Sequence, residues 1–357
     1  MKKGRQTLLA SALAALLVGA GPATVDELTL DPAVYTVLGT TFIEETELVL
    51  DYYEMVLDGS IISDELPDVR LVARREVRFT DEVQAKEDGR ITKLQRLFED
   101  LGSTVRVSLD VEGASEDHEA VSASDLQGSV VLFTWDDEEE EYTASFEEGD
   151  TGEEEHLAGM VMDADLSVFL PRGSVSAGDE WNVKTDGLEK VFAPGGDLWI
   201  LPESLGSDPF LNLDAIAMVA ATMISLADAV DEFDGTVTAK YLGEREKGGQ
   251  RLGVVKLQFD LTSESERGER LVVQARDLPR ELELVFDELN FMFAIKGEAD
   301  LLWDLDGNHF HSFEFEGDVG LVLELSWIQP MFESEIEVLG NYELSGTTRF
   351  RASIDDA

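Results

Sequence analysis

The sequence predicts a mainly β protein, a β-rich α+β fold in which long antiparallel strands form curved sheets or half-barrels with a few packed helices. Three observations support this fold class. Apolar and polar residues alternate over long segments such as residues 69–80, so that one face of each segment is apolar. Short turns with glycine, such as Asp88-Gly89, join these segments. Several segments exceed the usual five or six residues, and long antiparallel strands must twist and coil.

The first 23 residues have the pattern of a secretory signal peptide. Basic residues at the start precede an apolar run over residues 8–18, and small residues follow at Ala20 and Ala23, where we expect cleavage. The run is shorter than the roughly 20 residues that a membrane-spanning helix needs. The chain has no cysteine, which excludes disulfides and lipidation of an N-terminal cysteine. We expect an exported protein, periplasmic or extracellular, with no membrane anchor after cleavage.

The composition is strongly acidic, with 76 acidic and 27 basic residues and a formal net charge of −49. Such a polyanion repels nucleic acid and anionic membrane surfaces over about a Debye length, ~8 Å at physiological salt. We therefore expect no nucleic-acid partner. The acidity is explained either by adaptation to a salty exterior, which we favour, or by a cationic partner. The apolar content of 43% is ordinary for a globular chain.

After the signal peptide (1–23), we expect an N-terminal β-rich half over residues 24–205 and a C-terminal half over residues 206–357. The two halves either form separate domains or combine into one. Strands are expected in the N-terminal half over residues 39–57, 69–80, 91–97, 105–111, 129–135 and 142–146. The acidic loop 136–141 lies between the last two of these strands.

Three helices are expected, over residues 153–162, 186–192 and 211–231. The third has a long apolar run without glycine or proline, so we expect it to be buried or to lie across a sheet. An apolar helix that its own sheet does not cover would instead mark a ligand groove or a partner surface. Further strands are expected over residues 235–243, 251–263, 281–286, 291–305, 309–316, 319–328 and 333–354.

The hairpin over residues 299–315 has enough pattern to predict its register. We expect a three-residue turn at residues 306–308, because an odd loop brings the apolar sets of both strands to one face. The expected pairs are Leu305 with His309, Trp303 with His311 and Leu301 with Phe313. The apolar face would then continue across both strands.

Metal ligation is weakly indicated by the spacing of His309 and His311, which puts two imidazoles on one face of a strand. Asp304 and Asp306 point to the other face by parity, so an aromatic core or rim is favoured and we expect no metal there. A calcium loop starting at Asp304 also fails, because His309 stands where glycine is needed and Phe315 where glutamate is needed. We expect no cofactor, with Ca²⁺ on clustered carboxylates as the alternative.

Catalytic signatures are absent from the sequence. It contains no G-x-S-x-G elbow, no H-E-x-x-H, no phosphate-binding glycine loop and no cysteine nucleophile. Glycoside hydrolases use a pair of carboxylates. In a chain with 76 acidic residues such pairs arise by chance, so they do not indicate this activity. We therefore assign no catalytic residue.

The segment that begins at Leu166 contains a motif of the form L-P followed by V-x-x-G-D-x-W. The matching residues are Leu170, Pro171, Val175, Gly178, Asp179 and Trp181. It resembles a family of exported bacterial proteins of unknown function, which implies an exported β-rich protein and no particular activity. Physically, Gly178 and Asp179 suit a tight turn, and Trp181 is expected to anchor the next strand in the core.

The function predicted from these patterns is that of a non-enzymatic exported binding or interaction protein that shelters an apolar ligand on a concave sheet. The expected ligand contacts are Phe291, Phe293, Trp303, His311 and Phe313. The alternative is a structural envelope protein whose acidic surface holds Ca²⁺ or a cationic partner. A hydrolase that uses paired carboxylates is the least favoured interpretation.

Overall fold

The computed structural model describes residues 25–63, 68–111, 114–150, 152–164, 166–202, 233–267, 271–273, 284–331 and 334–356. The predicted signal peptide (1–23), the apolar helix expected over residues 211–231 and the boundary between the two predicted halves at residue 205 lie outside the described residues.

The described residues form mostly β-strands. The strands are β1 (Val25–Asp26), β2 (Val37–Leu57), β3 (Ser60–Ser63), β4 (Asp68–Glu87), β5 (Arg90–Val111), β6 (Ala114–Ala123), β7 (Val130–Asp136), β8 (Glu141–Phe146), β9 (Val175–Ser176), β10 (Glu180–Val183), β11 (Leu201–Pro202), β12 (Asp234–Lys247), β13 (Gln250–Arg267), β14 (Leu271–Val273), β15 (Leu284–Asp304), β16 (His309–Met331) and β17 (Ser334–Asp356). The helical turns are the 3₁₀ turns η1 (Glu154–Leu157) and η2 (Ser167–Phe169) and the short helix α1 (Glu189–Phe192).

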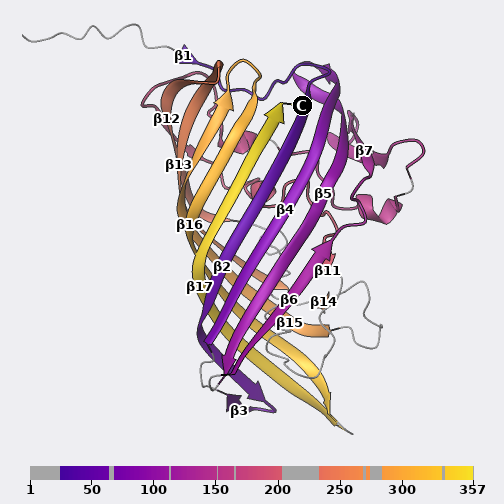
Figure 1. Cartoon of the computed structure of the whole chain (residues 1–357), viewed down its shortest axis with the longest axis vertical. Helices are drawn as coiled ribbons and strands as arrows, with labels where there is room; N and C mark the ends of the chain where they lie inside the picture. The colour runs from indigo at the N-terminus through magenta and orange to yellow at the C-terminus, as the bar shows by residue number, and fades with distance from the viewer. Residues whose placement is uncertain are drawn as a thin grey trace, which may run out of the picture.

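Fifteen of these strands belong to one antiparallel sheet, whose main path is β10-β12-β13-β15-β16-β17-β2-β4-β5-β6-β11. The long strands run side by side and coil strongly (Figure 1). The predicted mainly β fold of long antiparallel strands in a curved sheet is therefore confirmed. The last strand, β17, pairs with the early strand β2 from Val338↔Leu57 to Asp356↔Leu38, so strands from both ends of the chain share this sheet.

Several strands are longer than the sequence pattern predicted. β5 joins two expected strands, and so do β15 and β16. Glycines lie inside these strands without ending them. Gly297 and Gly317 are paired, and a Cβ on either would lie 2.4 or 2.6 Å from a carbonyl oxygen of the neighbouring strand. Glycine is needed there because the two backbones approach closely, and the strands continue through it.

The two faces of the sheet differ in chemistry. Along β4, alternate residues such as Val69, Leu71, Val77 and Phe79 are buried on the concave face. Arg70, Arg74 and Arg78 lie on the convex face and pair with glutamates: Arg70 with Glu47, Arg74 with Glu45 and Glu76, and Arg78 with Glu76. Neighbouring carboxylates thus neutralise these three arginines, and the apolar residues face inward.

A segment that we call the inner segment (residues 152–164 and 166–202) lies against the concave face, behind the long strands in Figure 1. Phe169 stacks on Phe313 with 5.4 Å between ring centroids, and Phe192 meets Phe350 edge-on at 6.1 Å. β10 pairs with β12 at one end of the sheet path, and β11 pairs with β6 at the other. The inner segment therefore spans the open sheet from one edge to the other.

A buried arginine fastens the inner segment to the sheet. Arg96 on β5 is 1% exposed and donates to both carboxylate oxygens of Asp81 at 2.7 and 2.8 Å. Its guanidinium also donates to the carbonyl oxygens of Val161 and Met162, and it lies 3.9 Å from the centre of the Phe79 ring. Five donors in a fixed fork let a single side chain satisfy a buried carboxylate and two carbonyl oxygens at once.

The Gly178–Trp181 motif acts at the edge of the sheet. Gly178 has φ of 100°, and the Asp179 carboxylate accepts a hydrogen bond from the Ser176 amide at 2.8 Å. Trp181 on β10 donates its indole N–H to the Phe169 carbonyl oxygen at 3.1 Å and is partly buried. Trp181 thus ties β10 to the turn around η2, at the border of the core.

The predicted helices over residues 153–162 and 186–192 are much shorter in the structure, where they correspond to η1 and α1. η1 buries none of its residues, so no apolar face stabilises a longer helix. No helix in the described part of the chain has both the length and the apolar character needed to cross a membrane.

The predicted register of the 299–315 hairpin is partly wrong. Leu301 pairs with Phe313 as expected, but Trp303 pairs with Phe310 and Asp304 with His309. A bulge between Leu302 and Trp303 shifts the register and leaves His311 as the extra residue. The cause is local, because the Asp304 carboxylate accepts hydrogen bonds from the Asp306 and Gly307 amides and so closes a longer turn.

Candidate ligand-binding site

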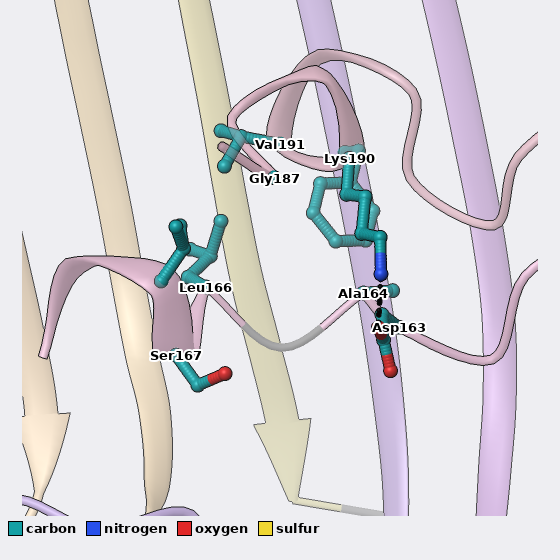
Figure 2. A pocket seen from close by; sticks show the side chains of 9 residues that line it. Asp163, Ala164, Leu166, Ser167, Gly187, Lys190 and Val191 are labelled. Carbon is teal, nitrogen blue, oxygen red and sulfur yellow. Dashed lines mark hydrogen bonds and ion pairs between the residues drawn. The ribbon is translucent and has the colours of Figure 1, made fainter. Parts of the chain in front are cut away.

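A cavity of about 220 Å³ lies between two turns of the inner segment and strand β2 (Figure 2). Its lining residues are Phe42, Asp163, Ala164, Leu166, Ser167, Val168, Gly187, Lys190 and Val191. One wall is the turn around η2, the other is the turn that leads into α1, and Phe42 comes from the sheet.

The η2 wall is held by its own backbone and by one aromatic anchor. Leu166 adopts a left-handed conformation with φ of 57°, and its carbonyl oxygen accepts the Phe169 amide at 3.2 Å. Phe169 is fully buried between Phe313 and Phe259. This anchoring leaves Leu166 and Val168 on the cavity wall.

The wall at α1 is likewise fixed by a backbone turn and by buried side chains. Gly187 has φ of 90°, a conformation that favours glycine, and the Leu188 amide donates to Thr185 at 3.0 Å. Leu188 is fully buried, and the ring of Phe192 packs against Phe233 and Phe350. Val191 and Lys190 then line the cavity.

Phe42 forms the part of the cavity that belongs to the sheet. It is 2% exposed, and its ring lies within 5.8 to 6.2 Å of the rings of Phe79, Phe350 and Phe310. A close-packed aromatic cluster of this kind gives the cavity a preformed surface.

An ion pair lies on one side of the cavity. Lys190 Nζ lies 2.7 Å from Asp163 Oδ2, and Figure 2 shows this ion pair linking the two walls. The two side chains are 44% and 40% exposed, so solvent reaches them. Ser167 adds a hydroxyl group to the lining. The arrangement suits a small apolar body with one polar end.

A second hollow, of about 380 Å³, lies at the sheet edge and is lined by Glu180, Trp181, Asn182, Thr238, Ala239, Lys240, Lys256 and Gln258. Its charged groups are already paired, Lys240 with Glu180 at 2.6 Å and Lys256 with Glu298 at 2.7 Å. A somewhat larger share of its lining is polar, so the cavity beside Phe42 is the better candidate for a ligand with an apolar part.

The residues considered as metal ligands do not converge. His309 is 6% exposed with Nδ1 2.8 Å from the Phe310 carbonyl oxygen, while Asp304 is engaged by the turn amides. Within the described ranges, one group has donor atoms close enough together for a metal ion, namely Glu153, Glu155 and His156. That group lies at η1 and contributes nothing to the cavity lining.

None of the five predicted ligand contacts lines the cavity. Trp303 is fully buried and donates its indole N–H to the Thr29 carbonyl oxygen at 3.1 Å, and Phe313 packs on Phe169. Phe293 is 2% exposed, and His311 is the partly buried bulge residue. Phe291 pairs with Ser265 and Leu323 in the sheet, and its side chain lies outside the described part of the structure. A ligand role for these five residues stays a prediction.

The cavity residues were missed because they come from distant parts of the chain. Phe42 belongs to β2, whereas the other lining residues belong to the inner segment. The sequence does contain one signal, since most of the lining lies beside the motif segment that begins at Leu166. A polar residue next to small and apolar ones, as at Asp163-Ala164 and Lys190-Val191, could have directed attention there.

The fold and the cavity define a mainly β protein with a curved 15-stranded sheet, a covered concave face and a small pocket lined by both apolar and polar groups. No family model matches the sequence, and no curated protein matches it either. Among solved structures, the chain is similar to an outer membrane channel from Pseudomonas putida F1, with 8% identity over 91% of this chain and 97% of that chain. The TM-score is 0.24, a similarity too low to support a common fold or a common function.

Proposed function

We propose that this protein is a non-enzymatic binding protein that takes up a small apolar molecule in the cavity beside Phe42. The observation that carries the proposal is a cavity lined by apolar side chains that buried aromatic rings anchor, together with the ion pair of Lys190 and Asp163. For comparison, an apolar cavity of ~150 Å³ is large enough to hold benzene. A ring or a short alkyl chain is therefore the size of ligand that fits.

Export from the cytoplasm is part of the same proposal. It is supported by the signal-peptide pattern of residues 1–23. A binding protein outside the cytoplasm works in a variable ionic environment. A net charge of −49 helps to keep such a chain soluble and dispersed.

The test is to fill the cavity. Ala164 lines it with a small side chain, so Ala164→Phe should occupy the space of the ligand. We expect 1-octanol to displace a one-ring apolar probe, toluene, from the parent protein, as followed by the NMR signal of the toluene. In Ala164→Phe, the affinity for both should fall by at least about tenfold, which is 1.4 kcal/mol of binding free energy.

Val72→Phe is the matched control, because Val72 is 38% exposed on β4 and lies away from the cavity lining. It should bind the probe like the parent, and both variants should keep the parent's far-ultraviolet circular dichroism. The proposal is wrong if the parent protein binds neither compound. It is also wrong if Ala164→Phe, correctly folded, binds them as the parent does.

A further inference from the structure

We infer that the ligand is an amphipathic cation, an apolar body with an ammonium head group, and that Asp163 binds this head group. The inference rests on the proposed binding function and adds the chemical class of the ligand. In this structure, Lys190 takes the position of the head group.

The side chain of Lys190 is itself an alkyl chain that ends in an ammonium group. It lines the cavity together with Phe42 and Val191, and its Nζ reaches Asp163 Oδ2 at 2.7 Å. An aliphatic amine is thus bound here, supplied by the protein. A ligand amine that enters the cavity can make the same contact with the same carboxylate.

The exchange of one ammonium for another requires that Lys190 moves away from Asp163. The Lys190 and Asp163 side chains are 44% and 40% exposed, and exposed ion pairs contribute little to stability. Lysine has a long flexible stem and can turn its charge into water, whereas the short side chain of Asp163 stays at the cavity. Removal of Lys190 from the carboxylate is therefore easy.

An anionic head group fits less well. It would pair with Lys190 but would lie close to the Asp163 carboxylate, and two like charges at a site repel each other. The field of the whole molecule acts in the same direction, because a net charge of −49 concentrates cations near the surface and repels anions.

The experiment compares three ligands of equal chain length, octylamine, 1-octanol and octanoate, by isothermal titration calorimetry at pH 7. Octylamine is cationic at this pH, since alkyl amines titrate near pH 10. We expect the parent protein to bind octylamine at least about tenfold more tightly than octanol, and octanoate most weakly. Added NaCl should weaken octylamine binding and leave octanol binding unchanged.

Two variants of the ion pair should change octylamine binding in opposite directions. Asp163→Asn should remove the advantage of octylamine over octanol and leave octanol binding unchanged. Lys190→Gln should bind octylamine several-fold more tightly than the parent, because the internal competitor is gone. Lys296→Gln, which breaks an exposed pair with Asp260 in the sheet, is the matched control and should match the parent.

The outcomes separate the inference from the proposed function. If octanol binds and octylamine has no advantage, the cationic ligand is wrong and the apolar binding site stands. If octanoate binds most tightly and Lys190→Gln abolishes that binding, the site is anionic and the inference is overturned. If none of the three compounds binds, both the inference and the proposed function are wrong.

Discussion

Glu44 and Glu45 are neighbours on β2, yet they lie on opposite faces of the sheet and their pKa values move in opposite directions. Burial on the concave face raises the pKa of Glu44, and the nearby charge of Arg75 and a hydrogen bond with Thr46 offset only part of this effect. Partial burial would also raise the pKa of Glu45. Hydrogen bonds from Arg351 and Arg74 on the convex face outweigh it, so that the pKa of Glu45 is lowered.

The comparison shows that one sheet presents two different environments to charge. On the concave face, ionisable groups are removed from water, and Arg96 is satisfied there only because Asp81 and two carbonyl oxygens surround it. On the convex face, pairs such as Arg349 with Glu316 stay in solvent, 60% and 68% exposed. Removal of an ion pair should therefore lower the free energy of unfolding much more on the concave face than on the convex face.

The largest difference is expected between two arginine substitutions. Arg96→Ala should lower the free energy of unfolding by about 3–5 kcal/mol, because it leaves the buried Asp81 carboxylate without its partner. Arg349→Ala removes an exposed pair and should cost at most about 1 kcal/mol. Urea denaturation followed by tryptophan fluorescence measures both.

Arg96→Ala should also loosen the inner segment, since Val161 and Met162 lose their donor. Faster amide exchange near these residues, with unchanged exchange in β16 and β17, would show this directly. Equal stability of the two variants would mean that Arg96 does not hold the inner segment to the sheet.

Two tryptophans give a smaller contrast within the core. Trp303 is fully buried on the sheet, and Trp303→Ala should cost about 3–5 kcal/mol, the usual range for a core aromatic. The sequence pattern predicted the same role for Trp181, but Trp181 is only partly buried at the sheet edge. Trp181→Ala should therefore cost about half as much. Thermal unfolding of both variants tests the difference. An equal loss of stability would mean that Trp181 contributes as much as a core aromatic residue.

Much of the fold follows from local pattern. Alternation along β4 correctly assigned Val69, Leu71, Val77 and Phe79 to one face, and Asp88-Gly89 forms the expected turn with φ values of 50° and 82°. Such signals depend on neighbours in the sequence. The bulge at Leu302 was missed because it results from the way the Asp304 side chain closes its turn, which strand alternation does not encode.

Features that depend on distant parts of the chain could not be predicted. The pairing of β17 with β2 joins the two ends of the chain, and no local pattern specifies which strands are neighbours. The burial of Arg96 under the inner segment is of the same kind, since nothing in the sequence distinguishes Arg96 from the exposed arginines near it. The cavity needs both the sheet residue Phe42 and the ion pair of Asp163 with Lys190, so it exists only in the assembled fold.

The smallest expected effect concerns pH and returns to the two glutamates. Glu44 has a raised pKa in the folded state, so the folded protein holds this proton more tightly than the unfolded chain, whose glutamates titrate near the ordinary value of 4.5. The contribution of Glu44 to stability should therefore fall as pH rises from about 4.5 through its raised pKa. Glu45 has a lowered pKa, and its contribution should be present above pH 4.5 and be lost as pH falls through the folded pKa.

Glu44→Gln and Glu45→Gln isolate these two contributions. The free energy of unfolding of the parent minus that of Glu44→Gln should decrease with rising pH, and the corresponding difference for Glu45→Gln should increase. Urea denaturation from pH 3 to pH 8 measures both slopes. Slopes of the same sign would mean that the two faces of β2 do not differ in how they solvate charge. Slopes of opposite sign for Glu44→Gln and Glu45→Gln would show that the face on which a carboxylate lies decides how its contribution to stability changes with pH.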